Sequence, residues 1–204
     1  MAQGKSKNIT RVEHRVSIDD RERRNKHKGG VLWFTGLSGA GKSTLAFALE
    51  EELFRRGYHV YVLDGDNVRY GLNSDLGFSH ADRTENIRRV GEVAALFATA
   101  GVICISAFIS PYVDDRALAR RAAGERFHEV YVQADVATCE KRDPKGLYRK
   151  ARSGEIADFT GVSAPYEAPE HADITIDTRI LSVEASVQTL IDFVTAKLGT
   201  GNPP

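Results

Sequence analysis

The sequence of 204 residues contains only two cysteines, Cys104 and Cys139, and they do not form a C-x-x-C pair. The usual zinc and thioredoxin-like motifs therefore have no support, and two small buried thiols in a reducing compartment are expected. No apolar run approaches the ~20 residues of a transmembrane helix. The N-terminal residues are polar and lack the apolar segment of a signal peptide, so we expect a cytoplasmic protein without a membrane partner.

An excess of charge of one sign is also missing. Lys and Arg together number 28, as do Asp and Glu, which gives a formal net charge of +0. Proteins that bind the phosphate backbone of nucleic acids usually carry a basic excess. We therefore expect no nucleic-acid partner, and instead a small anionic ligand held by local positive groups.

The chain divides into two parts of different character. Residues 1–29 are polar and dense in charges of both signs, and we interpret them as an arm with one short helix. The arm is either a solvated segment or a strap across a partner subunit, and the sequence leaves both open. Residues 30–204 read as one domain of ordinary size. Within it, residues 143–169 are charged, contain Gly and Pro and lack a period, which is typical of a lid.

Apolar runs alternate with amphipathic segments through this domain. Strands are predicted at about residues 31–36, 59–66, 102–108, 127–135 and 172–178, and helices at 43–57, 78–101, 114–123, 136–142 and near the C-terminus. Such alternation predicts an α/β fold, a three-layer sandwich with a mostly parallel five-stranded sheet. Ligands of these sheets bind at the carboxyl ends of the strands, where the loops after Phe34, Leu63 and Phe108 are expected to lie.

Residues 36–43, GLSGAGKS, match the phosphate-binding pattern G-x-x-x-x-G-K-[ST] between a predicted strand and a predicted helix. Glycines let backbone N–H groups turn onto phosphate oxygens, and the helix points its positive N-terminus at the same anion. Lys42 supplies a charge for the β- and γ-phosphates, and the Ser43 hydroxyl can bind Mg²⁺. The fold is therefore that of P-loop NTPases. The predicted ATP-binding residues are Gly36, Leu37, Ser38, Gly39, Ala40, Gly41, Lys42, Ser43 and Thr44.

A P-loop alone does not separate a kinase from a GTPase, an ATPase or a nucleotide sensor. Asp64 and Asp66 stand at the end of the second predicted strand, in LDGDN, and no NKxD motif of GTPases is present. A carboxylate there can bind magnesium through water or take a proton from the acceptor hydroxyl, although a turn or a helix cap also uses Asp. We prefer Asp66 as the base and, with Ser43, as a magnesium residue. Asp64 is assigned to the magnesium shell or held as a reserve base.

Several longer segments then resemble one family. DGDNVR, DRTENIRR, FISPY and DPKGLY occur in the order and spacing of adenylyl-sulfate kinases, and the similarity runs from about residue 28 to residue 177. The resemblance implies transfer of the γ-phosphoryl group of ATP to the 3′-hydroxyl of adenosine 5′-phosphosulfate, a step of sulfate assimilation. It also implies magnesium as cofactor and a homodimer.

The resemblance assigns acceptor-binding roles. Arg69, Arg83 and Asn86 are similar to residues that hold the phosphosulfate and the ribose, and guanidinium forks suit tetrahedral oxyanions. Phe78 and Phe159 are similar to the pair that sandwiches the acceptor adenine. The remaining acceptor contacts implied are Ile109 in the pocket wall and Lys145 in the lid.

Two further assignments follow from the resemblance. Arg142 is expected to stack on the ATP adenine. Ser110, in the FISP segment, corresponds to a serine described in the family as a phosphorylated intermediate. Because a serine hydroxyl is a poor nucleophile without a base beside it, we predict that Ser110 is not an obligatory intermediate. The predicted catalytic residues are thus Asp66, Lys42, Asp64 and, on the resemblance alone, Ser110.

Two other functions stay open from the sequence. The first is a non-catalytic domain that senses a sulfonucleotide; the intact Lys42 and Ser43 speak against it. The second is a P-loop kinase for another small hydroxyl acceptor, such as a nucleoside or a polyol. A panel of acceptors offered with ATP separates these functions.

Overall fold

The computed structural model describes residues 8, 10 and 12–200. Within them, five strands form one sheet in the order β2-β3-β1-β4-β5, and every pairing is parallel. The mostly parallel five-stranded sheet expected from the sequence is therefore confirmed. The strands are β1 (Gly30–Thr35), β2 (Val60–Asp64), β3 (Ile103–Ala107), β4 (Phe127–Gln133) and β5 (Ile174–Asp177).

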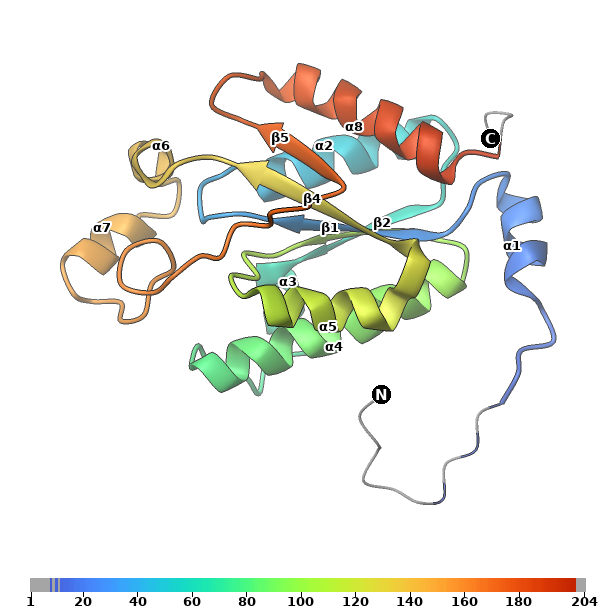
Figure 1. Cartoon of the computed structure of the whole chain (residues 1–204), viewed down its shortest axis with the longest axis horizontal. Coiled ribbons are helices and arrows are strands. Elements are labelled where there is room, and N and C mark those ends of the chain that lie inside the picture. Colours follow the sequence, from blue (N-terminus) through green and yellow to red (C-terminus); the bar gives the residue numbers. More distant parts are fainter. Residues whose placement is uncertain (1–7, 9, 11, 201–204) are drawn as a thin grey trace.

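Helices cover both faces of this sheet (Figure 1). α2 (Lys42–Arg55) and α8 (Val183–Leu198) lie on one face, and α4 (His80–Thr99) and α5 (Val113–Ala123) lie on the other. This is the predicted three-layer sandwich. The shorter described helices are α1 (Ile18–Asn25), α3 (Gly65–Tyr70), a 3₁₀ turn (Gly124–Arg126), α6 (Val136–Arg142) and α7 (Leu147–Arg152).

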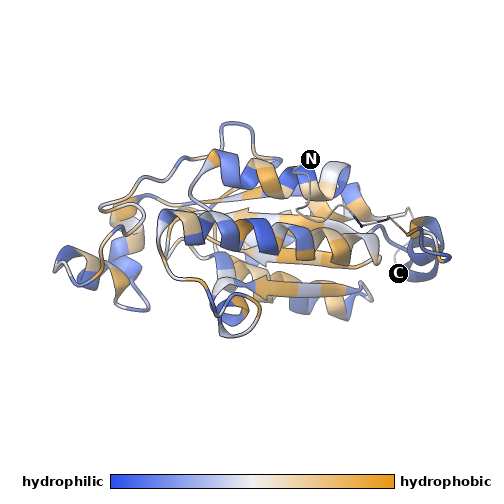
Figure 2. Ribbon diagram, turned by 90° about the horizontal axis from the view of Figure 1, so that it is seen from below, coloured by the Kyte–Doolittle hydropathy of each residue, from blue (hydrophilic) through white to orange (hydrophobic). Residues whose placement is uncertain are grey.

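The core lies in two layers, one on each side of the sheet. Strands buried on both faces are nearly continuous apolar runs, and every residue of β1 is buried. On the α4–α5 side, the Trp33 ring stacks between Phe108 and Phe127. Figure 2 shows largely hydrophobic strands between helices in which hydrophilic and hydrophobic residues are mixed. Cys104 and Cys139 are both buried free thiols, as expected.

Local sequence signals set the helix ends. The predicted pair Ser79 and Asp82 begins α4, because the Ser79 side chain accepts a hydrogen bond from the Asp82 amide. Gly57 follows α2 with φ 87°, a left-handed conformation that favours glycine. The short helix expected in the N-terminal arm is α1, which begins with a capping box of Ser17 and Asp20.

One expected boundary, the end of the second strand, needs correction. The second strand ends at Asp64 rather than residue 66, because the Asp64 carboxylate caps α3 by accepting from the Asp66 amide. The predicted lid, residues 143–169, contains the helix α7 and buries Tyr148. It is therefore partly packed onto the domain. None of the described helices is both long and apolar enough to cross a membrane.

Candidate functional site

The functional residues predicted from the sequence lie around the carboxyl ends of the parallel strands. The P-loop follows β1, Asp64 ends β2, and Ile109 and Ser110 follow β3. α6 and α7 lie beyond the same edge of the sheet (Figure 1). Parallel strands end on one edge, so segments distant in sequence meet there.

Glycine is required in the phosphate loop for two reasons. Gly36, Gly39 and Gly41 have φ of 153°, 77° and 104°, which L side chains rarely adopt. A Cβ atom on Gly36 would also lie 2.4 Å from the Val132 carbonyl oxygen. At the N-terminus of α2, Gly41 provides no side-chain cap, which leaves backbone N–H groups to bind an anion.

Lys42 turns its ammonium group into this loop. Its Nζ donates to the carbonyl oxygens of Gly36 at 2.9 Å and Leu37 at 2.8 Å, and the residue is buried. Burial lowers the pKa of Lys42 to about 8. The loop carbonyls thus hold a positive charge where the β- and γ-phosphates of a nucleotide would lie.

Ser43 and Asp64 form the adjacent polar pair. The Ser43 hydroxyl donates to Asp64 Oδ2 at 2.7 Å, and Asp64 is buried. The described residues include no cluster of three or more His, Cys, Asp or Glu side chains that could hold a metal ion. A hydroxyl beside a carboxylate does fit Mg²⁺, which arrives with the phosphates and keeps several waters.

Asp66 pairs with the lid instead. Its carboxylate forms an ion pair with Lys145, and both side chains are more than half exposed. The carboxylate that the structure places against Ser43 is thus Asp64, and the predicted magnesium role of Asp66 gains no support from its contacts. The ion pair of Asp66 and Lys145 thus joins α3 to the predicted lid.

Arg69, Phe78 and Arg83 form a cationic and aromatic cluster between α3 and α4. The Arg69 guanidinium lies 4.4 Å from the centre of the Phe78 ring, and the Phe78 side chain is exposed. Burial and the neighbouring Arg83 lower the pKa of Arg69. Arg83 donates to the carbonyl oxygens of Phe78 at 2.9 Å and Asp158 at 2.7 Å, and so joins α4 to the lid.

Asn86 lies one helical turn from Arg83 and is buried. Its Oδ1 accepts from Asn73 Nδ2 at 2.9 Å, which leaves the Asn86 amide nitrogen to donate elsewhere. Sequence reasoning missed Asn73, because an Asn in a loop carries no signal for burial.

Phe159, in the predicted lid, is buried, and its ring meets Tyr148 of α7 edge to face at 5.0 Å. Its contact with the acceptor adenine stays a prediction. Arg83 still joins the segments that carry Phe78 and Phe159, since it bonds Phe78, Asp158 and Thr160.

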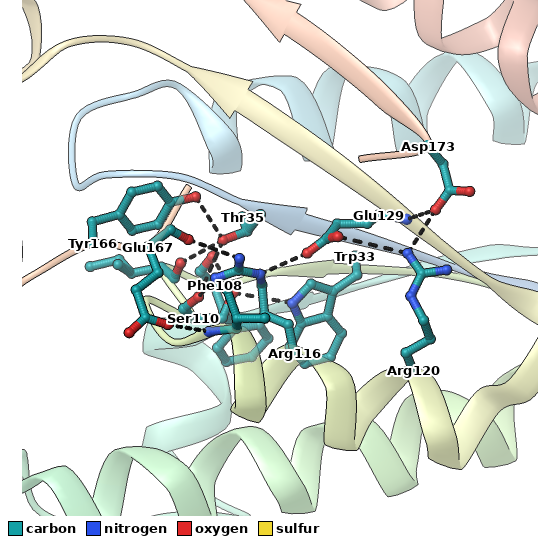
Figure 3. A network of polar contacts seen from close by, with 12 residues as sticks. Trp33, Thr35, Phe108, Ser110, Arg116, Arg120, Glu129, Tyr166, Glu167 and Asp173 are labelled. Carbon is teal, nitrogen blue, oxygen red and sulfur yellow. Dashed lines mark hydrogen bonds and ion pairs between the residues drawn. The ribbon is translucent and has the colours of Figure 1, made fainter. Parts of the chain in front are cut away.

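Two buried residues of β1, Trp33 and Thr35, form hydrogen bonds with the loop after β3, and Figure 3 shows both beside Ser110. The Ser110 hydroxyl accepts from Trp33 Nε1 at 3.1 Å, and Ser110 has φ 38°. Thr35 Oγ1 donates to the Ile109 carbonyl at 2.8 Å. Ser110 is therefore buried with its hydroxyl bonded to the core rather than free.

Arg142 lies against the outer side of the P-loop. Its guanidinium donates to Gly39 O at 3.3 Å, and to Thr178 O at 2.6 Å and Thr178 Oγ1 at 3.0 Å. These contacts buttress the loop from the β5 side. Stacking of Arg142 on the ATP adenine stays a prediction.

The sheet, the phosphate cradle with Lys42 and Ser43, and the cationic cluster of Arg69 and Arg83 define a P-loop kinase. Two solved structures of low identity share the fold. A gluconokinase from Sinorhizobium meliloti is 16% identical with a TM-score of 0.55, covering 82% of this chain and 95% of its own. A sugar kinase from Janibacter is also 16% identical, with a TM-score of 0.54, covering 80% of this chain and 93% of its own.

Residues 28–177 match the family described as adenylylsulphate kinase, and the chain belongs to that family. Adenylyl-sulfate kinase of Clostridium acetobutylicum is 56% identical over 190 residues, covering 93% of this chain and 95% of the relative. The relative of the same name from Geotalea daltonii is 57% identical over 188 residues, covering 92% and 93%. The structure of Mycobacterium tuberculosis APS kinase CysC in complex with AMPPNP and APS has a TM-score of 0.78 and 49% identity, covering 81% of this chain and 96% of that one.

Proposed function

We propose that this chain transfers the γ-phosphoryl group of ATP to the 3′-hydroxyl of adenosine 5′-phosphosulfate, giving 3′-phosphoadenosine 5′-phosphosulfate and ADP. The observation that carries the proposal is that a phosphate cradle and a cationic, aromatic cluster both lie at the edge where the parallel strands end. The Lys42 and Ser43 cradle suits a nucleotide triphosphate, and the Arg69, Phe78 and Arg83 cluster suits an anionic nucleotide acceptor. Family membership supplies the particular acceptor.

On the donor side, the P-loop amides and Lys42 bind the phosphates. Ser43 and Asp64 would hold Mg²⁺, which supplies positive charge to the β- and γ-phosphate oxygens when bound. Lys42 is already inside the loop, so it need only exchange carbonyl partners for phosphate oxygens. Phosphoryl transfer depends mainly on positioning and charge stabilisation, and these residues supply both.

On the acceptor side, Arg69 and Arg83 carry the charges that hold the phosphosulfate, and Asn86 offers its amide N–H₂ because Asn73 occupies its oxygen. The exposed Phe78 ring provides a face for the acceptor adenine. Asp66 would orient the 3′-hydroxyl and accept its proton as the bond to phosphorus forms. The Lys145 ammonium beside Asp66 would neutralise charge on the same side.

We further propose that the protein works as a homodimer in the cytoplasm. The resemblance to the family suggests the dimer, and Tyr61 of the edge strand β2, which is 53% exposed and stacks on Phe97 of α4, provides an aromatic pair that suits contact with a second copy. A relative of known structure, from Thiobacillus denitrificans, is a hexameric APS kinase, of whose chain this one covers 30%. The molar mass in solution, measured by light scattering, tests the dimer.

The activity test is a panel of acceptors offered to the purified protein with ATP and Mg²⁺. Adenosine 5′-phosphosulfate should yield ADP and a 3′-phosphorylated sulfonucleotide, and Lys42→Ala should abolish the signal as a control against contaminating kinases. Equal turnover with AMP would contradict the proposal, since the sulfate contacts would then give no selectivity. Binding of adenosine 5′-phosphosulfate without turnover would indicate a sensor instead.

A further inference from the structure

Arg116, in the first turns of α5, is a buried cation outside the predicted site. Its side chain is 3% exposed. Nε donates to Glu129 Oε1 at 2.7 Å, Nη1 to the Ser110 carbonyl at 2.8 Å and Nη2 to the Glu167 carbonyl at 2.8 Å. Figure 3 shows the guanidinium at the centre of this network. One planar fork thus joins a strand, the loop after β3 and the C-terminal part of the lid.

Glu129 gives this cation its counter-charge. It belongs to β4 and pairs in register with Trp33, so it shares the face of the sheet that α5 covers. A buried ion pair is weak evidence for a gain in stability, because an apolar pair of similar volume often does as well. The specific gain here is geometric, since Arg116 donates to carbonyl oxygens of two segments that no apolar side chain could bind.

The two segments are the acceptor loop, residues 108–112, and the lid exit, residues 164–168. They also meet directly, because the Glu167 amide donates to Pro111 O at 2.9 Å and the Val113 amide donates to Glu167 Oε2 at 2.7 Å. Ser110 in the acceptor loop holds φ 38°, a strained value for a residue with a side chain. Arg116 bonds the carbonyl of that residue.

A second link runs from the lid exit to the phosphate loop. Tyr166 Oη and Thr35 Oγ1 lie 3.0 Å apart. Since Thr35 donates its proton to the Ile109 carbonyl, Tyr166 acts as the donor in that contact. Thr35 directly precedes Gly36, the first residue of the phosphate loop. The lid exit therefore has fixed contacts to both halves of the site.

We propose that Arg116 is a positioning residue that couples the lid exit to the acceptor loop. A displacement of the lid around the acceptor moves the Glu167 carbonyl, and the rigid guanidinium transmits it to Ser110 and its neighbour Ile109. The position of the lid thus sets the acceptor pocket through Arg116. The link from the lid exit to the phosphate loop runs through Tyr166 and Thr35 and does not involve Arg116. This inference rests on the proposed function for the identity of the acceptor.

Two variants test it. Arg116→Lys keeps the charge but replaces the three-way fork by a single ammonium group. The double variant Arg116→Met with Glu129→Gln removes both charges, so that no unpaired charge stays buried. The matched control is Arg120→Met. Arg120 lies on the same helix and contacts Glu129 and Asp173, at 3.7 and 2.9 Å. Among the described residues it makes no hydrogen bond or ion pair to the acceptor loop or the lid.

Kinetics give the first readout. Both Arg116 variants should raise the KM for adenosine 5′-phosphosulfate about tenfold and change the KM for ATP less than about twofold, and Arg120→Met should change neither by more than about twofold. Equal increases in both KM values, or no increase in either, would overturn the proposal. A failure of the wild-type protein to phosphorylate adenosine 5′-phosphosulfate would instead overturn the proposed function.

Hydrogen exchange gives a readout that a merely structural residue would not move. On addition of adenosine 5′-phosphosulfate with a non-hydrolysable ATP analogue, exchange should slow in both residues 108–112 and 164–168 of the wild type. In the Arg116 variants the lid exit should respond without the acceptor loop. If the two segments still respond together, coupling does not pass through Arg116. Should neither variant fold, the wild type alone decides, because the proposal fails if the ligands slow exchange in only one of the two segments.

Discussion

Lys145 of the lid forms an ion pair with Asp66 at the start of α3. The pair joins the predicted lid to the predicted base. With side chains 56% and 65% exposed, it contributes less than about 1 kcal/mol to stability. It can therefore open readily, and a hydroxyl acceptor can take a place beside the Asp66 carboxylate without a large cost.

The first prediction concerns Asp66. Asp66→Asn should lower kcat by about 10²–10⁴-fold and leave the KM for the acceptor nearly unchanged, because the amide keeps the shape but cannot take the proton. Steady-state kinetics with adenosine 5′-phosphosulfate measure both constants. Lys145→Met is the companion variant, and it should mainly raise the acceptor KM. A change in KM alone for Asp66→Asn would make the residue a binding group.

The second prediction is a pH dependence of ATP binding. Burial lowers the pKa of Lys42 to about 8, so the free protein loses this charge as the pH rises through 8. Bound phosphates favour the charged form, and binding above pH 8 must therefore take up a proton. The Kd for ATP should be nearly constant below pH 7 and should rise steadily above pH 8.

Calorimetry in two buffers of different ionisation enthalpy measures that proton uptake directly. Lys42→Arg serves as the control, because a guanidinium stays charged throughout this range. Its ATP affinity, although weaker, should not fall as the pH rises from 7 to 9. A wild-type affinity that is flat over the same range would show that Lys42 does not titrate in the free protein.

Much of this site follows from local sequence. The glycines of the P-loop, the cap at Ser79 and the apolar strands each depend on a few neighbouring residues, and the structure agrees with them. Asp64 was harder to place, because its choice over Asp66 as partner of Ser43 depends on where β2 ends.

Tertiary contacts account for what the sequence could not give. Phe159 is buried because Tyr148, on a helix formed within the lid, lies against it. In the sequence, Arg116 looks like an ordinary charged residue of an amphipathic helix. Its role depends on bonds to Glu129 and Glu167, which are distant in sequence and meet it only in the folded protein. Charged residues of this kind carry no local sign of burial.

The third prediction concerns His27, which is buried between the arm and the domain. The His59 amide donates to its Nε2 at 2.9 Å, and its Nδ1 donates to the Lys28 carbonyl at 3.0 Å, which fixes the neutral form. Burial lowers the pKa of His27 below its usual 6.5. The unfolded chain therefore binds more protons below pH 6.5, and the free energy of unfolding should fall as the pH drops from there.

Urea denaturation between pH 8 and pH 5 measures this slope. His27→Gln should be less stable at pH 8 and should lose less stability on acidification than the wild type. Part of the slope should remain, because burial lowers the pKa of His128 in the same direction. His80→Gln is the matched control, since it removes an exposed imidazole in place of a buried one. An unaltered slope in His27→Gln would contradict the assignment.

The last prediction concerns Ser110 and the number of displacements at phosphorus. A covalent phosphoserine route needs the Ser110 oxygen to reach the γ-phosphorus, but that oxygen is buried and accepts a hydrogen bond from Trp33. Ser110→Ala leaves the Trp33 N–H unpaired and should lower the free energy of unfolding by about 1–3 kcal/mol. Its kcat should nevertheless stay within about tenfold of the wild type, because direct transfer depends on positioning and charge.

Transfer from ATP with a chiral γ-phosphorus should invert configuration, as one displacement requires. Retention, together with loss of turnover in Ser110→Ala, would establish two displacements and a covalent intermediate at this residue.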